Sequence, residues 1–130
     1  MKSGLISSMD NLTRSCCEGI SFIPQIKQTL PSEKELKDIT YIYKALSDPI
    51  RVKMLFALLN YEICVGEMSN LLELPQSHVS HQLKILRKYN IVTFKKDKKM
   101  SFYRIKNLHV KELLLKALQS VKEEDVKRED

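Results

Sequence analysis

The segment 65–89 constrains the fold most, because its pattern predicts two helices separated by only a tight turn. A short helix is predicted over 65–72, and Glu73-Leu74-Pro75-Gln76 supplies a turn into a second helix over 76–89, after which Asn90 suits the C′ position. The apolar residues of the second helix recur at helical spacing: Val79, Leu83 and Leu86. Its opposite face is polar and basic: Ser77, Ser80, His81, Lys84 and Lys88. This is the spacing of a helix-turn-helix.

Two further helices are predicted before this motif. Ser32 and Glu35 form a capping box, and apolar residues at helical spacing then predict a first helix over 33–47. The pair Asp48-Pro49 combines a favoured N-cap residue with a proline at the first helical position, so a second helix is predicted over 49–60. The helix-turn-helix is therefore expected to follow two helices that each carry an apolar stripe.

A β-hairpin and a last helix are predicted after the motif. Residues 91–95 and 100–105 are rich in β-branched and aromatic side chains, and a charged turn, Lys96-Asp97-Lys98-Lys99, separates them. Polar and apolar residues alternate imperfectly along both strands, so the pattern does not fix their register. Asn107 can cap a last helix that ends near Val121.

This order of elements predicts a mainly α-helical protein with a small β-hairpin, which is the winged helix-turn-helix fold. Residues 32–121 would form this domain. Residues 1–31 contain a Cys pair and two prolines without sustained periodicity, so they are expected to form an arm with at most a short helix. The tail 122–130 is charged and is expected to fray.

The positive charge of the chain is concentrated in one third of its length. The formal net charge is +6, and between Gln76 and Lys106 nine lysine or arginine residues accompany a single acidic residue, Asp97. The remainder of the chain is therefore slightly acidic. Such concentration favours a polyanionic partner over an ordinary solvated surface.

Composition and motifs also exclude several classes of protein. No apolar run approaches the roughly 18 residues that span a bilayer, and no signal-peptide pattern is found, so a cytoplasmic protein is expected. Three cysteines, an odd number, predict reduced thiols that are available for metal or redox chemistry. The sequence lacks a glycine-rich phosphate loop, and its helical Ser and His residues lack an orienting acid, so an enzyme is not expected.

The polar helix face and the basic hairpin together predict an interface with double-stranded DNA, because a helix fits the major groove. Base contacts are expected from Gln76, Ser77, His78, Ser80 and His81. Phosphate contacts are expected from Lys84 and Lys88 on the same helix, and from Lys95, Lys96, Lys98, Lys99 and Arg104 on the hairpin. Neutralising six to eight phosphates would give a slope of log affinity on log salt of roughly −5 to −7. A metal at the two histidines is an alternative, but their expected exposure on this face accounts for both.

Three stretches of the sequence carry a family resemblance: Ala45–Arg51, Glu62–Met68 and Gln76–Leu86. They resemble the ArsR/SmtB family of metalloregulatory repressors. The resemblance extends over about 36–121 and includes the hairpin end Phe102-Tyr103-Arg104-Ile105, which is similar to the family's wing. It implies a homodimer joined by its first and last helices, bound to a palindromic operator and released when an inducer binds.

The resemblance also implies a site for a thiophilic ion. One family site pairs thiols of the N-terminal arm with a cysteine just before the helix-turn-helix. Cys64 occupies that position, Cys16 and Cys17 lie in the arm, and Glu67 stands where zinc-sensing relatives have an Asp ligand. Glu18 is a weaker candidate. Thiolates are soft donors, so this set suits As(III), Sb(III), Cd(II) or Pb(II), and with Glu67 as a fourth ligand also Zn(II).

Two other family sites are expected to be absent. One lies on the last helix, and the matching positions here are Asn107, His109, Ser120 and Glu123. Because Asn and Ser replace two of its ligands, we interpret His109 as a surface or cap residue. The other site needs two closely spaced cysteines after the position of Cys64, and only Cys64 is there.

Two further hypotheses remain open at this stage. The chain is a thiol redox sensor if Cys16, Cys17 or Cys64 forms a disulfide or persulfide and this change releases DNA. It is a winged-helix regulator without a metal response if Cys64 serves only as a small apolar residue at the start of a helix and the arm cysteines are unused. A purely structural or protein-binding role would predict little dependence on DNA sequence.

Overall fold

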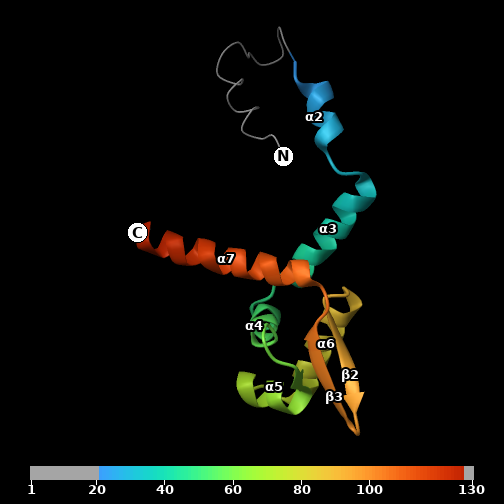
Figure 1. The fold of residues 1–130 in the computed structure, drawn as a ribbon, viewed down its shortest axis with the longest axis vertical. Helices are drawn as coiled ribbons and strands as arrows, with labels where there is room; N and C mark the ends of the chain where they lie inside the picture. The colour runs from blue at the N-terminus through green and yellow to red at the C-terminus, as the bar shows by residue number, and fades with distance from the viewer. Residues whose placement is uncertain (1–20, 128–130) are drawn as a thin grey trace. The chain divides into compact units, whose positions relative to one another are not determined.

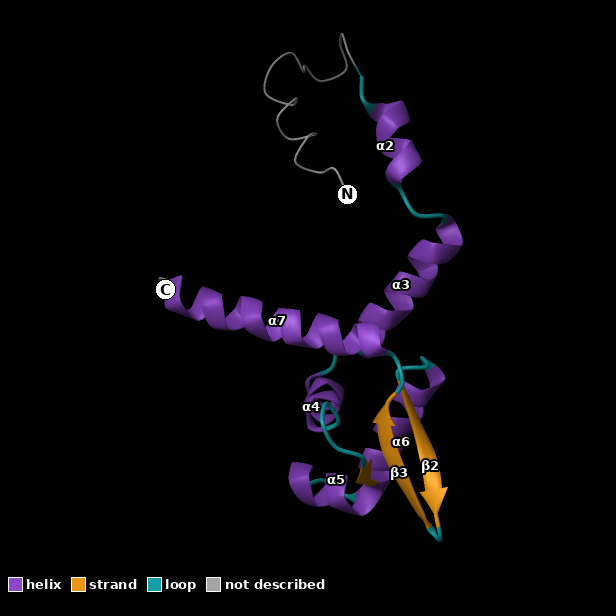
Figure 2. Ribbon diagram, viewed as in Figure 1, coloured by secondary structure: helices purple, strands orange, loops and turns teal. Residues whose placement is uncertain are grey.

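A computed structural model of the 130-residue chain describes residues 21–127, with side chains up to residue 124. The described part is mainly helical and contains one small antiparallel sheet (Figures 1 and 2). The chain divides after Leu36 into two compact units, which we treat separately. The elements are α2 (Ile23–Thr29), α3 (Glu33–Ala45), α4 (Pro49–Ala57), β1 (Ile63–Cys64), α5 (Val65–Leu72), α6 (Gln76–Lys88), β2 (Val92–Asp97), β3 (Met100–Ile105) and α7 (Leu108–Lys127).

The first unit contains α2 and the start of α3. The sequence allows at most a short helix in this region, and α2 has seven residues with a proline in its first turn. The predicted capping box at the start of α3 is confirmed. The Ser32 amide donates to Glu35 Oε1 at 2.8 Å, and the Glu35 amide donates to Ser32 Oγ at 3.1 Å.

The second unit begins within α3 and continues through α4. Asp48 caps α4 as predicted, because its Oδ2 accepts from the Arg51 amide at 3.0 Å and Pro49 follows at the first helical position. Both helices end earlier than predicted, α3 at Ala45 and α4 at Ala57. The apolar pattern continues past each end, so periodicity alone could not locate the ends.

The turn between α5 and α6 is as tight as predicted. Glu73 adopts a left-handed conformation with φ of 56°, and the Leu74 amide donates back to Ser69 O at 3.2 Å. Ser69 Oγ also donates to Leu74 O. These bonds satisfy the end of α5 and allow α6 to begin at Gln76.

The end of α6 is a Schellman motif, and Asn90 occupies its C′ position, as the sequence predicts. Asn90 has φ of 61°, its amide donates to Arg87 O at 2.9 Å, and the Ile91 amide donates to Leu86 O at 3.0 Å. Leu86 and Ile91 are both fully buried, which supplies the apolar contact typical of this motif.

The sheet has three strands in the order β1-β3-β2, all antiparallel. The two-residue strand β1 was not predicted, and it pairs Cys64 with Phe102 of β3. The predicted four-residue hairpin turn is wrong. Asp97 pairs with Met100, so only Lys98 and Lys99 form the turn.

Helix α7 runs to Lys127, so the prediction that it ends near Val121 is wrong by six residues. Lys and Glu are good helix formers, and Gln119 Nε2 donates to Glu123 Oε2 one turn later at 3.1 Å. The predicted cap is confirmed, because Asn107 Oδ1 accepts from the His109 amide at 3.0 Å.

The core lies where α4, α5 and α6 meet the sheet. As predicted, Val79, Leu83 and Leu86 on α6 are no more than 1% exposed. Ala45 of α3 and Val110 and Leu114 of α7 join the same cluster. The fold is thus a winged helix-turn-helix whose second motif helix is fixed by its apolar face. No helix within residues 21–127 combines the length and apolar character needed to span a membrane.

Candidate nucleic-acid interface

The outward face of α6 carries a set of exposed polar side chains, in agreement with the sequence analysis. Packing of the apolar stripe against α4, α5 and β2 fixes which face is turned to solvent. The exposed residues are Gln76, Ser77, Ser80, His81, Lys84 and Lys88. His78, the remaining residue predicted to contact bases, is half-buried.

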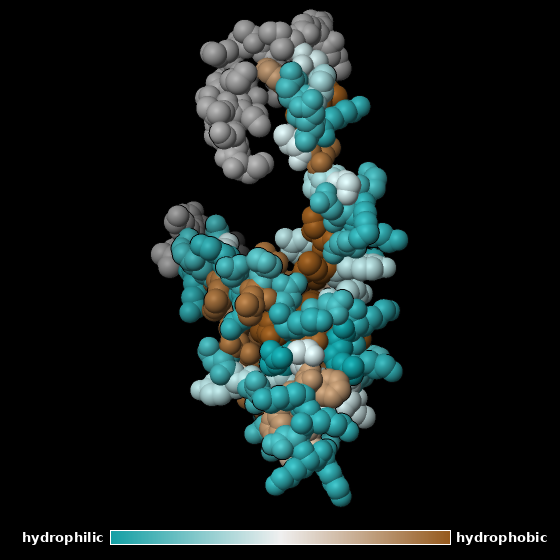
Figure 3. Space-filling model, turned by 45° about the vertical axis from the view of Figure 1, so that its right-hand side comes forward, coloured by the Kyte–Doolittle hydropathy of each residue, from teal (hydrophilic) through white to brown (hydrophobic). Residues whose placement is uncertain are grey.

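The hairpin carries the second part of the predicted interface. Its two strands lead away from the core to a turn at one end of the domain (Figure 1), and hydrophilic side chains cover that end (Figure 3). The predicted basic residues there are all exposed: Lys95, Lys96, Lys98, Lys99 and Arg104. Lys95 lies 3.8 Å from Glu62 Oε1, so part of its charge is already compensated within the chain.

The hairpin of β2 and β3, called the wing below, is held against α6 by aromatic contacts that the sequence analysis did not identify. The Arg87 guanidinium lies over the Phe94 ring, 4.5 Å from its centroid. Phe94 in turn packs against Tyr103 of β3, with ring centroids 5.3 Å apart. Stacking of this kind holds the strands beside the end of the helix. These contacts therefore keep the basic residues of the wing on a strand pair that packs against α6.

A hydrogen-bond chain also joins α6 to the end of α3, and sequence reasoning missed it. Arg51 Nε donates to Ala45 O at 2.8 Å, and Arg51 Nη1 donates to Gln82 Oε1 at 3.0 Å. Gln82 Nε2 lies 3.4 Å from His78 Nε2. The only sequence signal was an arginine and a glutamine within the helical pattern, 31 residues apart.

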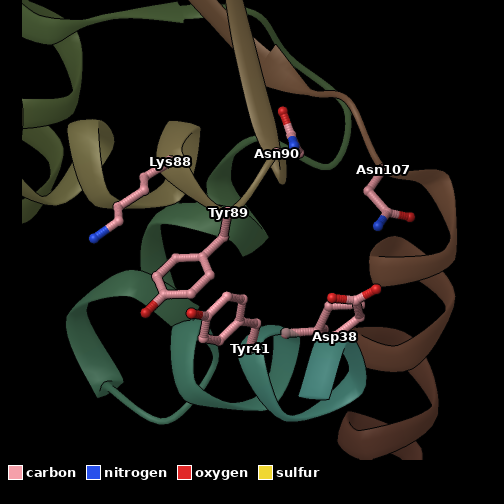
Figure 4. A pocket seen from close by; sticks show the side chains of 7 residues that line it. Asp38, Tyr41, Lys88, Tyr89, Asn90 and Asn107 are labelled. Atoms are coloured by element: carbon pink, nitrogen blue, oxygen red, sulfur yellow. The ribbon is translucent and has the colours of Figure 1, made fainter. Parts of the chain in front are cut away.

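A cavity of about 380 Å³ lies where α3, the end of α6 and the start of α7 come together. Figure 4 shows Tyr41, Tyr89, Asp38 and Asn107 around it. The rings of Tyr41 and Tyr89 meet edge to face, with centroids 5.6 Å apart and planes at 78°. This contact packs the end of α6 against α3.

Cys64, the predicted ion ligand, lies at the junction of β1 and α5. Its side chain is only 5% exposed, and it borders a cavity of about 270 Å³ whose other walls include Lys99, Ser101 and Tyr103. Cys64 is the N-cap of α5, where its amide donates to Glu67 Oε1 at 3.0 Å in a capping box. Cys64 and Glu67, the two predicted ligands within the described residues, are therefore neighbours, and Glu67 is exposed.

The remaining predicted ligands, Cys16, Cys17 and Glu18, lie outside the described residues. Within residues 21–127, no three His, Cys, Asp or Glu side chains are grouped closely enough to hold a metal ion. A site built on Cys64 and Glu67 thus needs donors from beyond this range. The Cys64 thiol is a soft donor that suits a thiophilic ion, and the Glu67 carboxylate lies in the same first turn of α5.

The last helix carries the residues that the sequence analysis assigned to capping. Asn107 uses its side-chain oxygen to cap α7, and His109 is exposed with its Nδ1 3.4 Å from Glu112 Oε1. These contacts agree with the interpretation of His109 as a surface residue.

Known proteins match this arrangement in sequence and in structure. Residues 48–93 match the family described as bacterial regulatory protein, arsR family. A cadmium resistance transcriptional regulatory protein CadC homolog of Staphylococcus aureus is 32% identical over 82% of this chain and 91% of its own length. A transcriptional repressor SmtB homolog of Synechocystis is 27% identical over 85% of this chain and 86% of its own length.

Among solved structures, HlyU from Vibrio cholerae superimposes with a TM-score of 0.64 and 32% identity over 69% of this chain and 97% of its own length. These matches confirm both the family resemblance of the three sequence stretches and the predicted fold class. The chain therefore belongs to the ArsR family of bacterial regulatory proteins, as a winged helix-turn-helix regulator that binds DNA.

Proposed function

We propose that the chain represses transcription by holding α6 in the major groove of an operator, and that a thiophilic ion releases it. The exposed polar face of α6, set beside the basic wing, carries the proposal. Gln76, Ser77 and His81 would contact base edges, together with Ser80 and His78. Lys84, Lys88 and the wing residues would contact phosphates.

The proposed functional unit is a homodimer joined by α3 and α7. Both helices leave large apolar side chains exposed in the second unit, among them Ile39, Tyr43, Leu115, Leu118 and Val121. Figure 3 shows apolar side chains gathered over α7 and α3, in contrast to the hydrophilic wing. A second copy covering these side chains would space two α6 helices on a palindromic operator.

The proposed inducer site combines Cys64 with Cys16 and Cys17 of the arm, with Glu67 as a fourth ligand for Zn(II) or Cd(II). Support comes from the cavity beside Cys64 and from the names of two relatives, a cadmium resistance regulator and an SmtB homolog. Bound As(III), Sb(III), Cd(II), Pb(II) or Zn(II) would supply strong bonds to thiolate sulfur.

Occupancy of this site would act through α5. Cys64 and Glu67 form the first turn of α5, and α5 packs directly on α6. The ion would draw the arm to this turn. It weakens DNA binding only if it binds more tightly to a dimer conformation in which the two α6 helices are wrongly spaced for successive major grooves of DNA. Couplings of about 1–3 kcal/mol are typical, which corresponds to roughly 5- to 150-fold in affinity.

The test is a fluorescence anisotropy titration of the chain's own upstream DNA, with and without As(III), Cd(II), Pb(II) or Zn(II). Cys16→Ser, Cys17→Ser and Cys64→Ser should each bind DNA like the wild type but lose the response to the ion. His109→Ala, which removes an exposed donor on α7, is the matched control and should keep the response.

Each other outcome selects a different function. An unchanged DNA affinity at saturating ion leaves only a regulator without a metal response. Release by mild oxidant, with loss of titratable thiols and without any ion, identifies the redox sensor. DNA affinity that does not depend on sequence would contradict the repressor itself.

A further inference from the structure

The starting point is the position of Arg51, whose side chain is anchored at two points to the end of α3. Its Nε donates to Ala45 O at 2.8 Å and its Nη2 donates to Lys44 O at 3.2 Å. A cation beside the last carbonyls of a helix is favoured by the helix dipole. Its Nη1 is thereby directed to Gln82 Oε1, at 3.0 Å.

This contact fixes the orientation of the Gln82 amide. A guanidinium has only hydrogen-bond donors, so the side of the amide that meets Arg51 has to be its oxygen. The NH₂ group then points to the other side, where its nitrogen lies 3.4 Å from His78 Nε2. Because an amide NH₂ only donates, His78 Nε2 has to accept.

The consequence for His78 is a defined tautomer. A nitrogen that accepts a hydrogen bond carries no hydrogen, so the hydrogen of the neutral ring lies on Nδ1. His78 is half-buried on the N-terminal half of α6, so one edge is held by Gln82 while part of the ring stays accessible.

We propose that Arg51 and Gln82 are positioning residues that set the hydrogen-bonding polarity of His78, so that His78 offers a donor, Nδ1–H, to a base edge. The favoured partner is a major-groove acceptor, such as a purine N7, guanine O6 or thymine O4. This inference rests on the proposed function in one respect, namely that the exposed polar face of α6 lies in the major groove of DNA. The tautomer itself does not depend on DNA.

The first test therefore uses the free protein. In Gln82→Glu the carboxylate keeps the contact with Arg51 but can only accept, so His78 Nε2 has to donate to it. At mildly alkaline pH, the ¹⁵N shifts of the His78 ring should show hydrogen on Nδ1 in the wild type and on Nε2 in the variant. The same tautomer in both proteins would overturn the proposal.

The second test measures base discrimination with duplexes in which one major-groove acceptor at a time is replaced by an analogue that lacks it. At one position per half-site, the wild type should lose on the order of five- to tenfold in affinity. Gln82→Glu should lose that dependence at the same position. Gln28→Glu, which adds the same charge in α2, should discriminate like the wild type.

The two tests separate the possible failures. If Gln82→Glu changes the His78 tautomer but the protein shows no sequence-specific DNA binding, the hydrogen-bond chain from Arg51 to His78 stands and the proposed function is contradicted. Unchanged discrimination in Gln82→Glu, with a changed tautomer, would remove His78 from base recognition. If Gln82 had a merely structural role, Gln82→Glu would lower the melting temperature and leave the tautomer of the His78 ring unchanged.

Discussion

Within residues 21–127, three non-glycine residues with positive φ lie at the junctions that shape the proposed binding surface. Glu73 is in the helix-turn-helix turn, Asn90 follows α6, and Lys98 is at the tip of the hairpin. Asn tolerates the left-handed region, whereas for Lys it costs about 1–2 kcal/mol that glycine would avoid. A lysine at such a position is explained if its charge is used there.

Lys98→Gly should therefore separate stability from binding. Relief of the left-handed strain should raise the free energy of unfolding by up to about 1 kcal/mol, offset by the extra freedom of glycine in the unfolded chain. Loss of one phosphate contact should lower DNA affinity and make the salt slope less steep by about 1. Urea unfolding and anisotropy at several salt concentrations measure the two effects.

Lys98→Ala is the control for this pair of effects, because it removes the charge and keeps the strained backbone. It should weaken DNA binding as much as Lys98→Gly does, without the gain in stability. If both variants bind like the wild type, the tip of the wing does not contact DNA.

Local residue interactions could be predicted from the sequence, whereas distant ones could not. The caps at Ser32, Asp48 and Asn107 depend on residues two or three positions away, so their spacing is visible in the sequence. The bond from Arg51 to Gln82 joins residues 31 apart. Nothing in either local pattern indicates that the two helices bring them together.

At the scale of elements, the errors in prediction have physical causes. Strand β1 has two residues, too few for alternation to appear, and it forms only because β3 offers a free edge. The charged turn of the hairpin was predicted too long, because Lys96 and Asp97 continue the β ladder despite their low strand propensity. The segments with strong helical periodicity, α5 and α6, were predicted to within one residue.

The start of α7 offers a prediction at this scale. Asn107→Ala should lower the free energy of unfolding by about 1 kcal/mol, because the His109 amide loses its cap. Asn107→Asp keeps an acceptor at the same place and should be nearly neutral. Thermal or urea unfolding of the free protein provides the measurement.

The same pair of variants examines whether Asn107 has a role beyond capping. Because we place the inducer at Cys64, neither variant should change the effect of Cd(II) or Zn(II) on DNA binding. A lost response in Asn107→Ala, with intact folding, would return the metal site to the last helix.

At the scale of the whole molecule, the candidate site could be predicted only in part. The exposed face of α6 and the basic wing follow from periodicity and charge within 76–106, and the structure exposes these side chains. The proposed thiol site would depend on Cys16 and Cys17 of the arm, and the proposed dimer on a second copy of the chain. No local pattern specifies the arrangement of either. Exposed apolar side chains on α3 and α7 mark where that second copy would pack.

Leu118→Glu tests this arrangement directly. Leu118 is 38% exposed in the single chain, next in the apolar series to Leu115 and Val121. In a dimer joined by α7, the variant would bury a carboxylate among apolar side chains, so it should be monomeric in sedimentation equilibrium. A monomer reaches only one half-site, and losing the linked second contact should lower operator affinity about a hundredfold or more.

Ser120→Glu is the matched control, since it adds the same charge two positions along α7, on the other side of the helix. It should remain dimeric and bind like the wild type. Because Leu118 lies on α7 and outside the buried core, the Leu118→Glu monomer should still unfold cooperatively, although at a lower urea concentration than the dimeric control, which subunit contact stabilises. A dimeric Leu118→Glu would place the subunit interface elsewhere, whereas a monomer with full operator affinity would show that two linked reading helices are not required.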